Sequence, residues 1–264
     1  MSKRIFLTGA SSGIGRATAE LLVRQGHQVW GTSRDPTRLP VLENFHPVTL
    51  DLAESVSACA SFDRALTEAG RFDVLINNAG SGHFDQAATL PPEVWHEQFQ
   101  ILVFAQIALC QRALEAMCAQ GGGLIVNVSS MAARLPVPYM SAYNAAKAAL
   151  ASFTMTLQLE LSDSAVRVVD VQPADIRTSF NEAVVQKQPN DPALLQVWEQ
   201  VDANLQAAPP PELVARRIVR LIGQKNPPPR ITVGGAFQAG VAPLIFRLLP
   251  QRVRLWGLRR YYRL

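Results

Sequence analysis

The sequence predicts an α/β domain in which helices cover both faces of a parallel sheet, a doubly wound arrangement. Apolar runs of strand length alternate with segments of helical length up to about residue 171. Several of these runs lack a polar face, as expected for strands that are buried on both sides. A glycine-rich turn follows the first run. With 264 residues and 48% hydrophobic content, we expect residues 1–264 to fold as one domain around a single large core.

The expected elements follow one another regularly. Strands are predicted at residues 4–7, 28–32, 48–50, 74–76, 124–128 and 166–171, and helices at residues 13–25, 56–68, 92–118 and 141–161. The alternation fails between residues 179 and 211, where a polar, proline-flanked insertion carries several apolar residues. An insertion of this length predicts a lid over an apolar substrate, and a surface excursion or a dimer contact is the alternative.

The cysteines argue against a fold that is held together by disulfide bonds or by a metal ion. Cys59, Cys110 and Cys118 are odd in number and lack CxxC or Cys/His spacing, so neither a disulfide framework nor a metal site is expected. The apolar run that begins at Ile5 leaves no room for a secretory signal. We therefore expect a cytoplasmic protein. The apolar segment 231–249 is broken by proline and arginine and is not expected to span a membrane.

Positive charge is concentrated at the C-terminal end. The net charge is +4, yet no acidic residue follows Glu212, and eleven Lys or Arg residues do. Residues 241–264 form a basic amphipathic segment in which Trp256 and other apolar residues are interleaved with arginines. This pattern is compatible with peripheral contact with a membrane surface, but a solvated tail or a subunit contact is the favoured interpretation. Nucleic-acid binding is not expected, since no recognised motif is present.

The glycine-rich turn predicts a dinucleotide-binding site. Gly9 allows a sharp turn from strand to helix, Gly13 lets the backbone approach a pyrophosphate, and Gly15 lets the helix pack on the strand. The helix that follows directs its N-terminus towards the anion. The predicted binding residues of the turn are Gly9, Ser11, Ser12, Gly13, Ile14 and Gly15.

The end of the second predicted strand favours NADP(H) over NAD(H). A carboxylate usually accepts the ribose hydroxyls of NAD at this place, whereas this chain has Ser33 and Arg34, which suit a 2′-phosphate. Asp35 comes one residue later. Asp51 at the end of the third strand, with its neighbour Leu52, is predicted to contact the adenine. The residues that follow the fourth strand, Asn78, Ala79 and Gly80, are predicted to line the cofactor site.

Three residues predict acid–base chemistry on a carbonyl group. Ser130 follows the fifth strand, Tyr143 lies thirteen residues further on, and Lys147 is one helical turn beyond the tyrosine. On a helix, residues i and i+4 share a face, so the ammonium group is expected to lower the pKa of the phenol. Tyr143 would then exchange a proton with a substrate oxygen that is hydrogen-bonded to Ser130.

In combination and order, these motifs resemble the short-chain dehydrogenase/reductase family, single-domain subtype. The resemblance covers residues 4–178 and rests on Thr8–Gly15, Asn77–Gly80, Ser130 and Tyr143-x-x-x-Lys147. It implies a Rossmann-type domain, a homodimer or homotetramer, and hydride transfer between NADP(H) and a carbonyl or secondary alcohol. It also implies that Tyr143 and Lys147 contact the nicotinamide ribose. The segment expected to contact the nicotinamide amide includes Pro173, Ile176 and Thr178.

Two positions depart from the family pattern. Leu102 stands where the family has a catalytic asparagine, which puts the usual proton relay in doubt, and Ala174 replaces the glycine of a Pro-Gly pair. Within the family, the chain looks most similar to hydroxysteroid and retinoid dehydrogenases or ketosphinganine reductases, which implies a bulky apolar ketone or alcohol as substrate. The alternative function is a catalytically weak NADP(H)-binding sensor.

Overall fold

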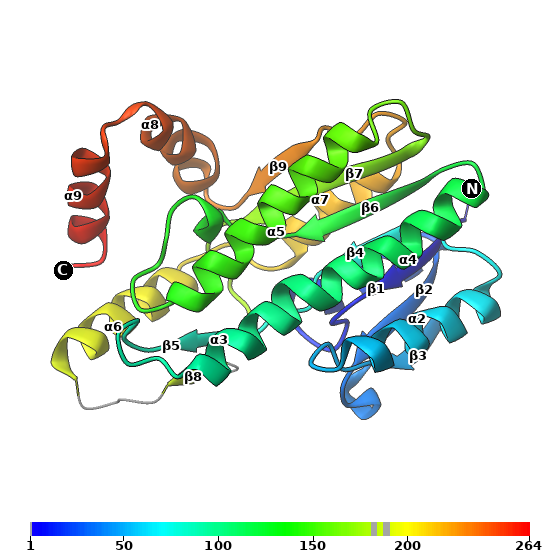
Figure 1. The fold of residues 1–264 in the computed structure, drawn as a ribbon, viewed down its shortest axis with the longest axis horizontal. Helices are drawn as coiled ribbons and strands as arrows, with labels where there is room; N and C mark the ends of the chain where they lie inside the picture. Colours follow the sequence, from blue (N-terminus) through cyan, green and yellow to red (C-terminus); the bar gives the residue numbers. More distant parts are fainter. Residues whose placement is uncertain (1, 181–183, 187–190) are drawn as a thin grey trace.

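A twisted parallel sheet forms the centre of the protein (Figure 1). The computed structural model describes residues 2–180, 184–186 and 191–264. Within these residues, seven strands are ordered β3-β2-β1-β4-β6-β7-β9, and every neighbouring pair is parallel. The strands are β1 (Arg4–Leu7), β2 (Gln28–Ser33), β3 (Phe45–Thr49), β4 (Val74–Asn77), β6 (Gly123–Val128), β7 (Val166–Pro173) and β9 (Arg230–Val233). The expected doubly wound α/β fold is confirmed.

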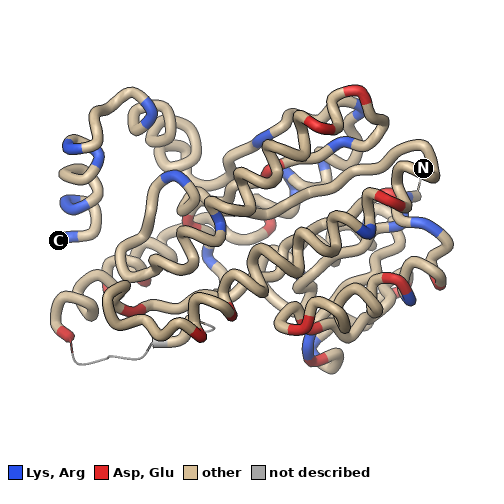
Figure 2. Tube along the Cα trace, viewed as in Figure 1, with Lys and Arg blue, Asp and Glu red and all other residues tan. Residues whose placement is uncertain are grey.

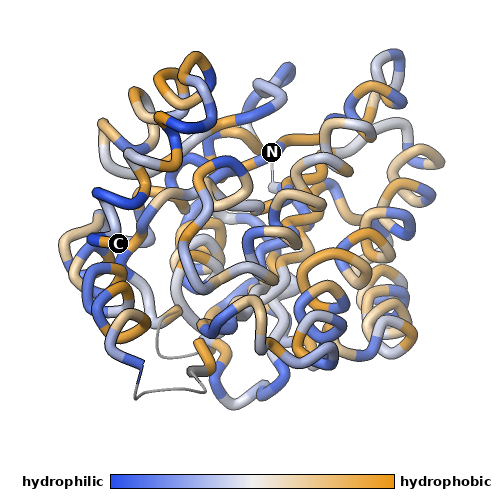
Figure 3. Tube along the Cα trace, turned by 60° about the vertical axis from the view of Figure 1, so that its left-hand side comes forward, coloured by the Kyte–Doolittle hydropathy of each residue, from blue (hydrophilic) through white to orange (hydrophobic). Residues whose placement is uncertain are grey.

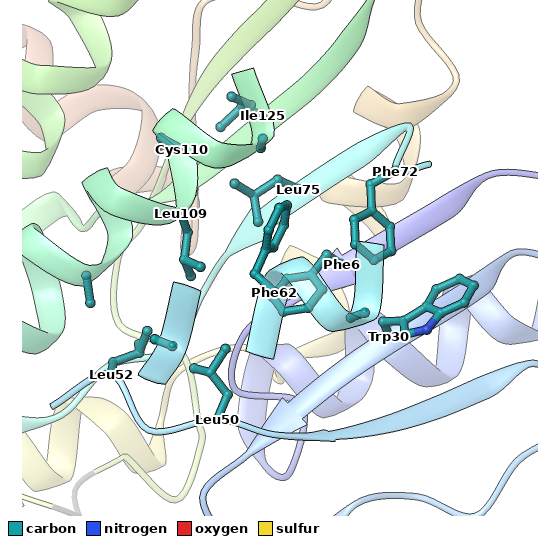
Figure 4. Packing of buried hydrophobic residues seen from close by; sticks show 14 of the residues in the cluster. Phe6, Trp30, Leu50, Leu52, Phe62, Phe72, Leu75, Leu109, Cys110 and Ile125 are labelled. Carbon is teal, nitrogen blue, oxygen red and sulfur yellow. The ribbon is translucent and has the colours of Figure 1, made fainter. Parts of the chain in front are cut away.

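Side chains alternate between two apolar cores, one on each face of the sheet. Phe6, Leu75 and Ile125 point to the first core, while the residues next to them in each strand point to the second. The first core lies under α2 (Ser55–Ala69), α4 (Ala105–Ala119) and α5 (Ser141–Glu160), and its aromatic part is shown in Figure 4. The second lies under α1 (Gly13–Arg24) and α7 (Glu212–Ile222). Since both faces are covered, the strands need no polar face.

The order of the strands places the predicted dinucleotide turn at the centre of the sheet. From β1 the chain proceeds to β2 and β3 on one side, and then crosses to β4 on the other side of β1. The carboxyl ends of β1 and β4 therefore border the point at which the strand order reverses, where open α/β sheets bind their ligands.

Several elements differ from the expectation, among them β9 and α7, for which no strand or helix was predicted. β3 begins at Phe45, before the expected start at residue 48; it contains Pro47, which an edge strand tolerates. The expected helix 92–118 consists of α3 (Pro92–Phe99), a π-helical turn (η2, Gln100–Phe104) and α4. The interval 179–211 contains a short strand, β8 (Val184–Gln186), paired with β5 (Gly82–Phe84), and a helix, α6 (Pro192–Gln206).

The C-terminal segment folds back towards α6. After a π-helical turn (η5, Phe237–Val241), it forms α8 (Ala242–Leu248) and α9 (Gln251–Tyr261). The amide of Asn204 on α6 donates a 3.0 Å hydrogen bond to the Tyr261 hydroxyl, and Gln196 donates to the carbonyl of Arg263. Figure 1 shows α8 and α9 projecting beyond the sheet on the side that carries α6.

One continuous helical stretch, Pro92–Ala119, has the length and apolar composition of a membrane span. Half of its most apolar window is buried inside the domain, against the sheet and α5. A buried core helix explains the same composition.

Candidate active site

The glycine turn after β1 has the shape that a bound pyrophosphate requires. Gly9 has a φ of +71°, and a Cβ at this position would lie 2.9 Å from the Ala79 Cα. A Cβ on Gly15 would lie only 1.9 Å from the carbonyl oxygen of Gly9. Ser12 precedes α1, and no side chain caps the helix. The first amide groups of α1 are thus left to a ligand, so the turn fits the phosphates of a dinucleotide.

Thr178 faces this turn from the other half of the sheet. The Thr178 side chain lies 3.3 Å from the position that a Cβ on Gly13 would occupy, and Ile176 is buried just before it. Pro173 ends β7, and Ala174 continues the pairing with β9 through a 2.8 Å hydrogen bond to the Val233 carbonyl. The alanine therefore fits without disturbing the turn.

At the end of β2, the Arg34 guanidinium is exposed, and the nearby Asp35 carboxylate is hydrogen-bonded within its own turn. Arg34 is exposed, whereas Ser33 is nearly buried and accepts a hydrogen bond from the Asp35 backbone amide. The Asp35 carboxylate accepts hydrogen bonds from the amide and hydroxyl of Thr37, and these lower its pKa. Because Asp35 caps this turn, Arg34 is the group presented to a ligand. Arg38, which the sequence analysis did not consider, adds a second exposed cation nearby.

The strand ends next to this cation hold the other predicted cofactor residues. Asp51 is partly exposed, with one carboxylate oxygen accepting from the Ala53 amide, and Leu52 is buried. The Asn78 side chain donates to the carbonyls of Thr8 and Gly9, so it holds the glycine turn in place. The neighbouring Asn77 does not line the cofactor site, because its amide is buried against Asn127.

Ser130, Tyr143 and Lys147 come together at the carboxyl end of the sheet. Ser130 follows β6, its hydroxyl accepts a hydrogen bond from the Ala132 amide, and it lies close enough to the Tyr143 phenol on α5 to lower the pKa of that phenol. The Lys147 Nζ lies 5.8 Å from the centre of the tyrosine ring and donates a 2.8 Å hydrogen bond to the Val128 carbonyl. It also lies 3.9 Å from the position of a Cβ on Gly80. The predicted catalytic and cofactor residues are therefore contiguous.

Burial changes the pKa of both α5 groups. It raises the pKa of Tyr143, a change that the nearby Ser130 hydroxyl partly offsets. It lowers the pKa of Lys147 to about 8, while the nearby Asp170 carboxylate acts in the opposite direction. The expected net fall in the pKa of the phenol is therefore wrong for this structure, because burial outweighs the effects that lower it.

Leu102 lies beside these groups on the π-helical turn η2. It is 0% exposed, and its Cδ2 is 3.3 Å from the position of a Cβ on Gly80. The wider turn is stabilised by Gln106, which donates hydrogen bonds to the carbonyls of Ile101 and Ala79. An apolar side chain thus occupies a place next to Gly80, itself close to Lys147.

An apolar cluster adjoins Tyr143 on the side away from the glycine turn. Phe180 lies against the tyrosine ring with centroids 5.6 Å apart, and Trp198 of α6 packs against Phe84. The cluster also includes Tyr262 from the C-terminal end of the chain. Nothing in the sequence indicated that Tyr262 reaches this region, since the cluster joins segments that are far apart along the chain.

The Asp175 carboxyl links the site to the same C-terminal segment. It accepts hydrogen bonds from Gln238 and from the Tyr261 hydroxyl, and burial raises its pKa.

Of the cysteines, Cys110 is buried, and burial raises the pKa of its thiol to about 12. This thiol is therefore unreactive.

Comparison with known proteins agrees with this geometry. The short chain dehydrogenase family profile matches residues 3–189. A 3-ketodihydrosphingosine reductase of Bacteroides thetaiotaomicron is 32% identical over 267 residues, covering 98% of this chain and 97% of the relative. A crystal structure of a short-chain dehydrogenase from Streptomyces avermitilis has a TM-score of 0.84 at 28% identity, covering 99% of this chain and 97% of that one. A metagenomic short-chain oxidoreductase in complex with NADP has a TM-score of 0.72 at 28% identity, covering 88% and 97% of the two chains.

The fold and the glycine turn define an oxidoreductase of the dinucleotide-binding α/β class that uses a nicotinamide cofactor. The chain belongs to the short-chain dehydrogenase family.

Proposed function

We propose that this protein is an NADP(H)-dependent reductase that interconverts a ketone and a secondary alcohol, with Tyr143 as the proton donor. The observation that carries the proposal is the position of the Tyr143 phenol. It lies near Ser130 and one helical turn from Lys147, beside the turn that fits a dinucleotide. Lys147 is buried at 3% exposure and faces Gly80, so the pair is not a tyrosine beside a solvated surface lysine.

Ser130, Tyr143 and Lys147 are each proposed to have a distinct role in carbonyl reduction. When bound, the nicotinamide supplies the hydride for the carbonyl carbon. The Ser130 hydroxyl orients the carbonyl oxygen, and the Tyr143 Oη transfers its proton to that oxygen as the alcohol forms. The Lys147 ammonium group stabilises the resulting tyrosinate. In the oxidative direction the same groups act in reverse.

The protonation states of Tyr143 and Lys147 suit the reductive direction, which an excess of NADPH would drive. Because burial raises the pKa of Tyr143, the phenol keeps its proton at neutral pH and is ready to donate it. With a pKa of about 8, Lys147 is protonated at pH 7 and supplies the positive charge that the tyrosinate needs. We place the protein in the cytoplasm, where NADPH is in excess.

The preference for NADP(H) rests on the end of β2. Arg34 is exposed and can pair with a 2′-phosphate. The Asp35 carboxylate instead accepts hydrogen bonds from the amide and hydroxyl of Thr37. A bidentate contact between guanidinium and phosphate is stronger than a neutral hydrogen bond. Asp51 and Leu52 are proposed to contact the adenine.

The proposed substrate is a ketone carried on a bulky apolar group. Supporting this class, Phe180 lies against Tyr143, and Phe84, Met140 and Trp198 belong to the same cluster. The bacterial relative is named for a 3-keto sphingoid base, which is a ketone on a long apolar chain. We propose that the interval 179–211, which contains α6, acts as the lid of this site; its residues 181–183 and 187–190 lie outside the described part of the chain.

A homodimer or homotetramer is proposed to form through α4 and α5. Phe104, at the end of η2 just before α4, and Met155 and Leu159 on α5 are exposed apolar side chains. Figure 1 shows α4 and α5 in front of the sheet. Burying them between subunits would remove this apolar surface from water. Light scattering of the wild type and of Leu159→Glu tests the proposal; a wild-type monomer would contradict it.

The function is tested by following NADPH oxidation with three ketones: 3-ketodihydrosphingosine, a steroid ketone and a small ketone. We expect turnover with at least one of the bulky ketones and little with the small one. Equal rates with all three would contradict the substrate class. Tight NADPH binding without turnover of any ketone would instead favour the sensor function.

A further inference from the structure

The C-terminal part of the chain carries an apolar stripe that the fold leaves uncovered. Phe237, Val241, Leu244 and Leu248 follow one another along η5 and α8 at spacings of four, three and four residues, so they share one face of a helix. They are exposed, Leu248 to 84%, Leu244 to 65% and Phe237 to 64%. An apolar stripe of this length on the surface marks an interaction site.

A cavity lined with arginines lies beside this stripe. It has a volume of about 450 Å³ and lies between α7, the end of β9 and the turn η5. Arg216, Arg217 and Arg220 line it from α7, and Ala239 and Gly240 line it from η5. The lining contains no acidic residue, and none of the three arginines forms an ion pair with a described residue. Three guanidinium groups around one cavity, without an ion pair among the described residues, suit a phosphate or another anionic headgroup.

The second C-terminal helix extends the same combination of apolar and cationic groups. On α9, Trp256 is 65% exposed and Leu255 is exposed, next to Arg252, Arg259 and Arg260. All the charged residues that Figure 2 shows along α8 and α9 are basic, and no acidic residue follows Glu212 in the sequence. Figure 3, which brings this side of the molecule forward, shows hydrophobic and hydrophilic residues interleaved along the C-terminal helices.

We propose that the surface formed by η5, α8 and α9, together with the cavity lined by Arg216, Arg217 and Arg220, binds the headgroup region of an anionic lipid bilayer. The stripe Phe237–Leu248 enters the boundary between headgroups and acyl chains, and the arginines bind the phosphates. Charge complementarity identifies this partner. A second copy of the chain would bring two strongly basic surfaces together, because residues 213–264 carry eleven basic and no acidic side chains.

The inner face of α9 connects this surface to the active site. Leu258 and Tyr262 point away from the solvent and belong to the apolar cluster that packs against Tyr143. Binding to a bilayer would therefore hold the apolar side of the site near the lipid. This consequence rests on the proposed function, whereas binding to the bilayer does not.

The test is co-sedimentation of the full chain with phosphatidylcholine vesicles that contain or lack phosphatidylserine. We expect binding to the anionic vesicles, weaker binding as salt rises, and little binding to pure phosphatidylcholine. Each arginine near an anionic surface contributes about 1 kcal/mol, or about fivefold in affinity. Arg216→Gln/Arg217→Gln/Arg220→Gln should therefore weaken binding by about a hundredfold.

Matched controls separate a local site from net charge and general hydrophobicity. The control Arg24→Gln/Arg64→Gln/Arg112→Gln removes the same charge from α1, α2 and α4, and it should bind nearly as the wild type does. Leu244→Gln/Leu248→Gln should weaken binding by about tenfold or more. Val56→Gln, at another exposed apolar position, should leave binding unchanged. Inorganic phosphate is added to the vesicle assay and compared with another salt at the same ionic strength. Equal displacement of the protein by the two salts would support a bilayer, rather than free phosphate, as the ligand.

Several results would overturn the proposal: absence of binding to anionic vesicles, equal binding by the two arginine triples, or equal binding to neutral vesicles. A stable dimer that is lost in Leu244→Gln/Leu248→Gln, with no vesicle binding by the wild type, would show that a second copy covers the stripe. NADPH oxidation without vesicles tests the enzyme separately, so failure of the docking proposal leaves the proposed function intact.

Discussion

Replacing Lys147 with Met should stabilise the fold at neutral pH, although it removes a group that the proposed reaction needs. Burial lowers the pKa of Lys147 from 10.5 to about 8, so keeping the side chain protonated in the folded state costs about 3 kcal/mol at pH 7. Methionine has a similar shape and no charge. It leaves the Val128 carbonyl without its hydrogen bond, at a cost of about 1 to 2 kcal/mol. The expected net gain is about 1 to 2 kcal/mol.

The pH dependence of this gain has a definite sign. A base whose folded pKa is lowered destabilises the fold fully below that pKa, and the penalty is relieved as the pH rises from about 8 to 10.5. The advantage of Lys147→Met should therefore shrink above pH 8 and disappear near pH 10, where the lost hydrogen bond dominates. Urea unfolding of both proteins at pH 7 and pH 10 measures this change. A variant that is less stable at pH 7, or a difference that is the same at both pH values, would refute the reasoning.

Four further predictions follow from the site. Arg34→Ala should weaken NADPH binding by at least tenfold and leave NADH binding nearly unchanged in fluorescence titrations; equal losses would contradict the 2′-phosphate assignment. Gly15→Ala should abolish cofactor binding, because its Cβ would meet the Gly9 carbonyl oxygen at 1.9 Å; retained affinity in the same titration would be incompatible with this turn. Leu102→Asn should lower the free energy of unfolding by about 2 to 4 kcal/mol, since it buries an amide in an apolar place; a variant as stable as the wild type would reveal a polar partner there. NADPH-dependent reduction should decline as the pH rises through about 8, where Lys147 loses its proton; a flat rate from pH 7 to 9 would argue against that role.

The central sheet was predictable because its signals are local. Apolar runs buried on both faces, such as β4 and β6, cannot be mistaken for surface segments, and their positions are confirmed within one residue. The glycine turn and the pair formed by Tyr143 and Lys147 are equally local, since each depends on a fixed spacing within one element. Leu102 was singled out from sequence as a departure from the family pattern, and the structure places it beside Gly80.

The features that were missed depend on contacts between distant segments. β3 begins early at Phe45 because pairing with β2 extends through a stretch that contains Pro47 and alternates in polarity. The pKa of Tyr143 was wrongly expected to fall, because burial by residues far along the chain cannot be read from the i,i+4 spacing. The position of Tyr262 in the apolar cluster depends on how α9 packs against α6, which no local pattern encodes.

The most direct test of the account is Tyr143→Phe, measured by NADPH titration and by single-turnover reduction of the best ketone. Phenylalanine keeps the ring that packs against Phe180 and removes only the hydroxyl group, so the fold and the affinity for NADPH should be retained. The account predicts that hydride transfer slows by about 10² to 10⁴ fold. Turnover that remains at the wild-type rate would show that another group delivers the proton and would contradict the proposed mechanism.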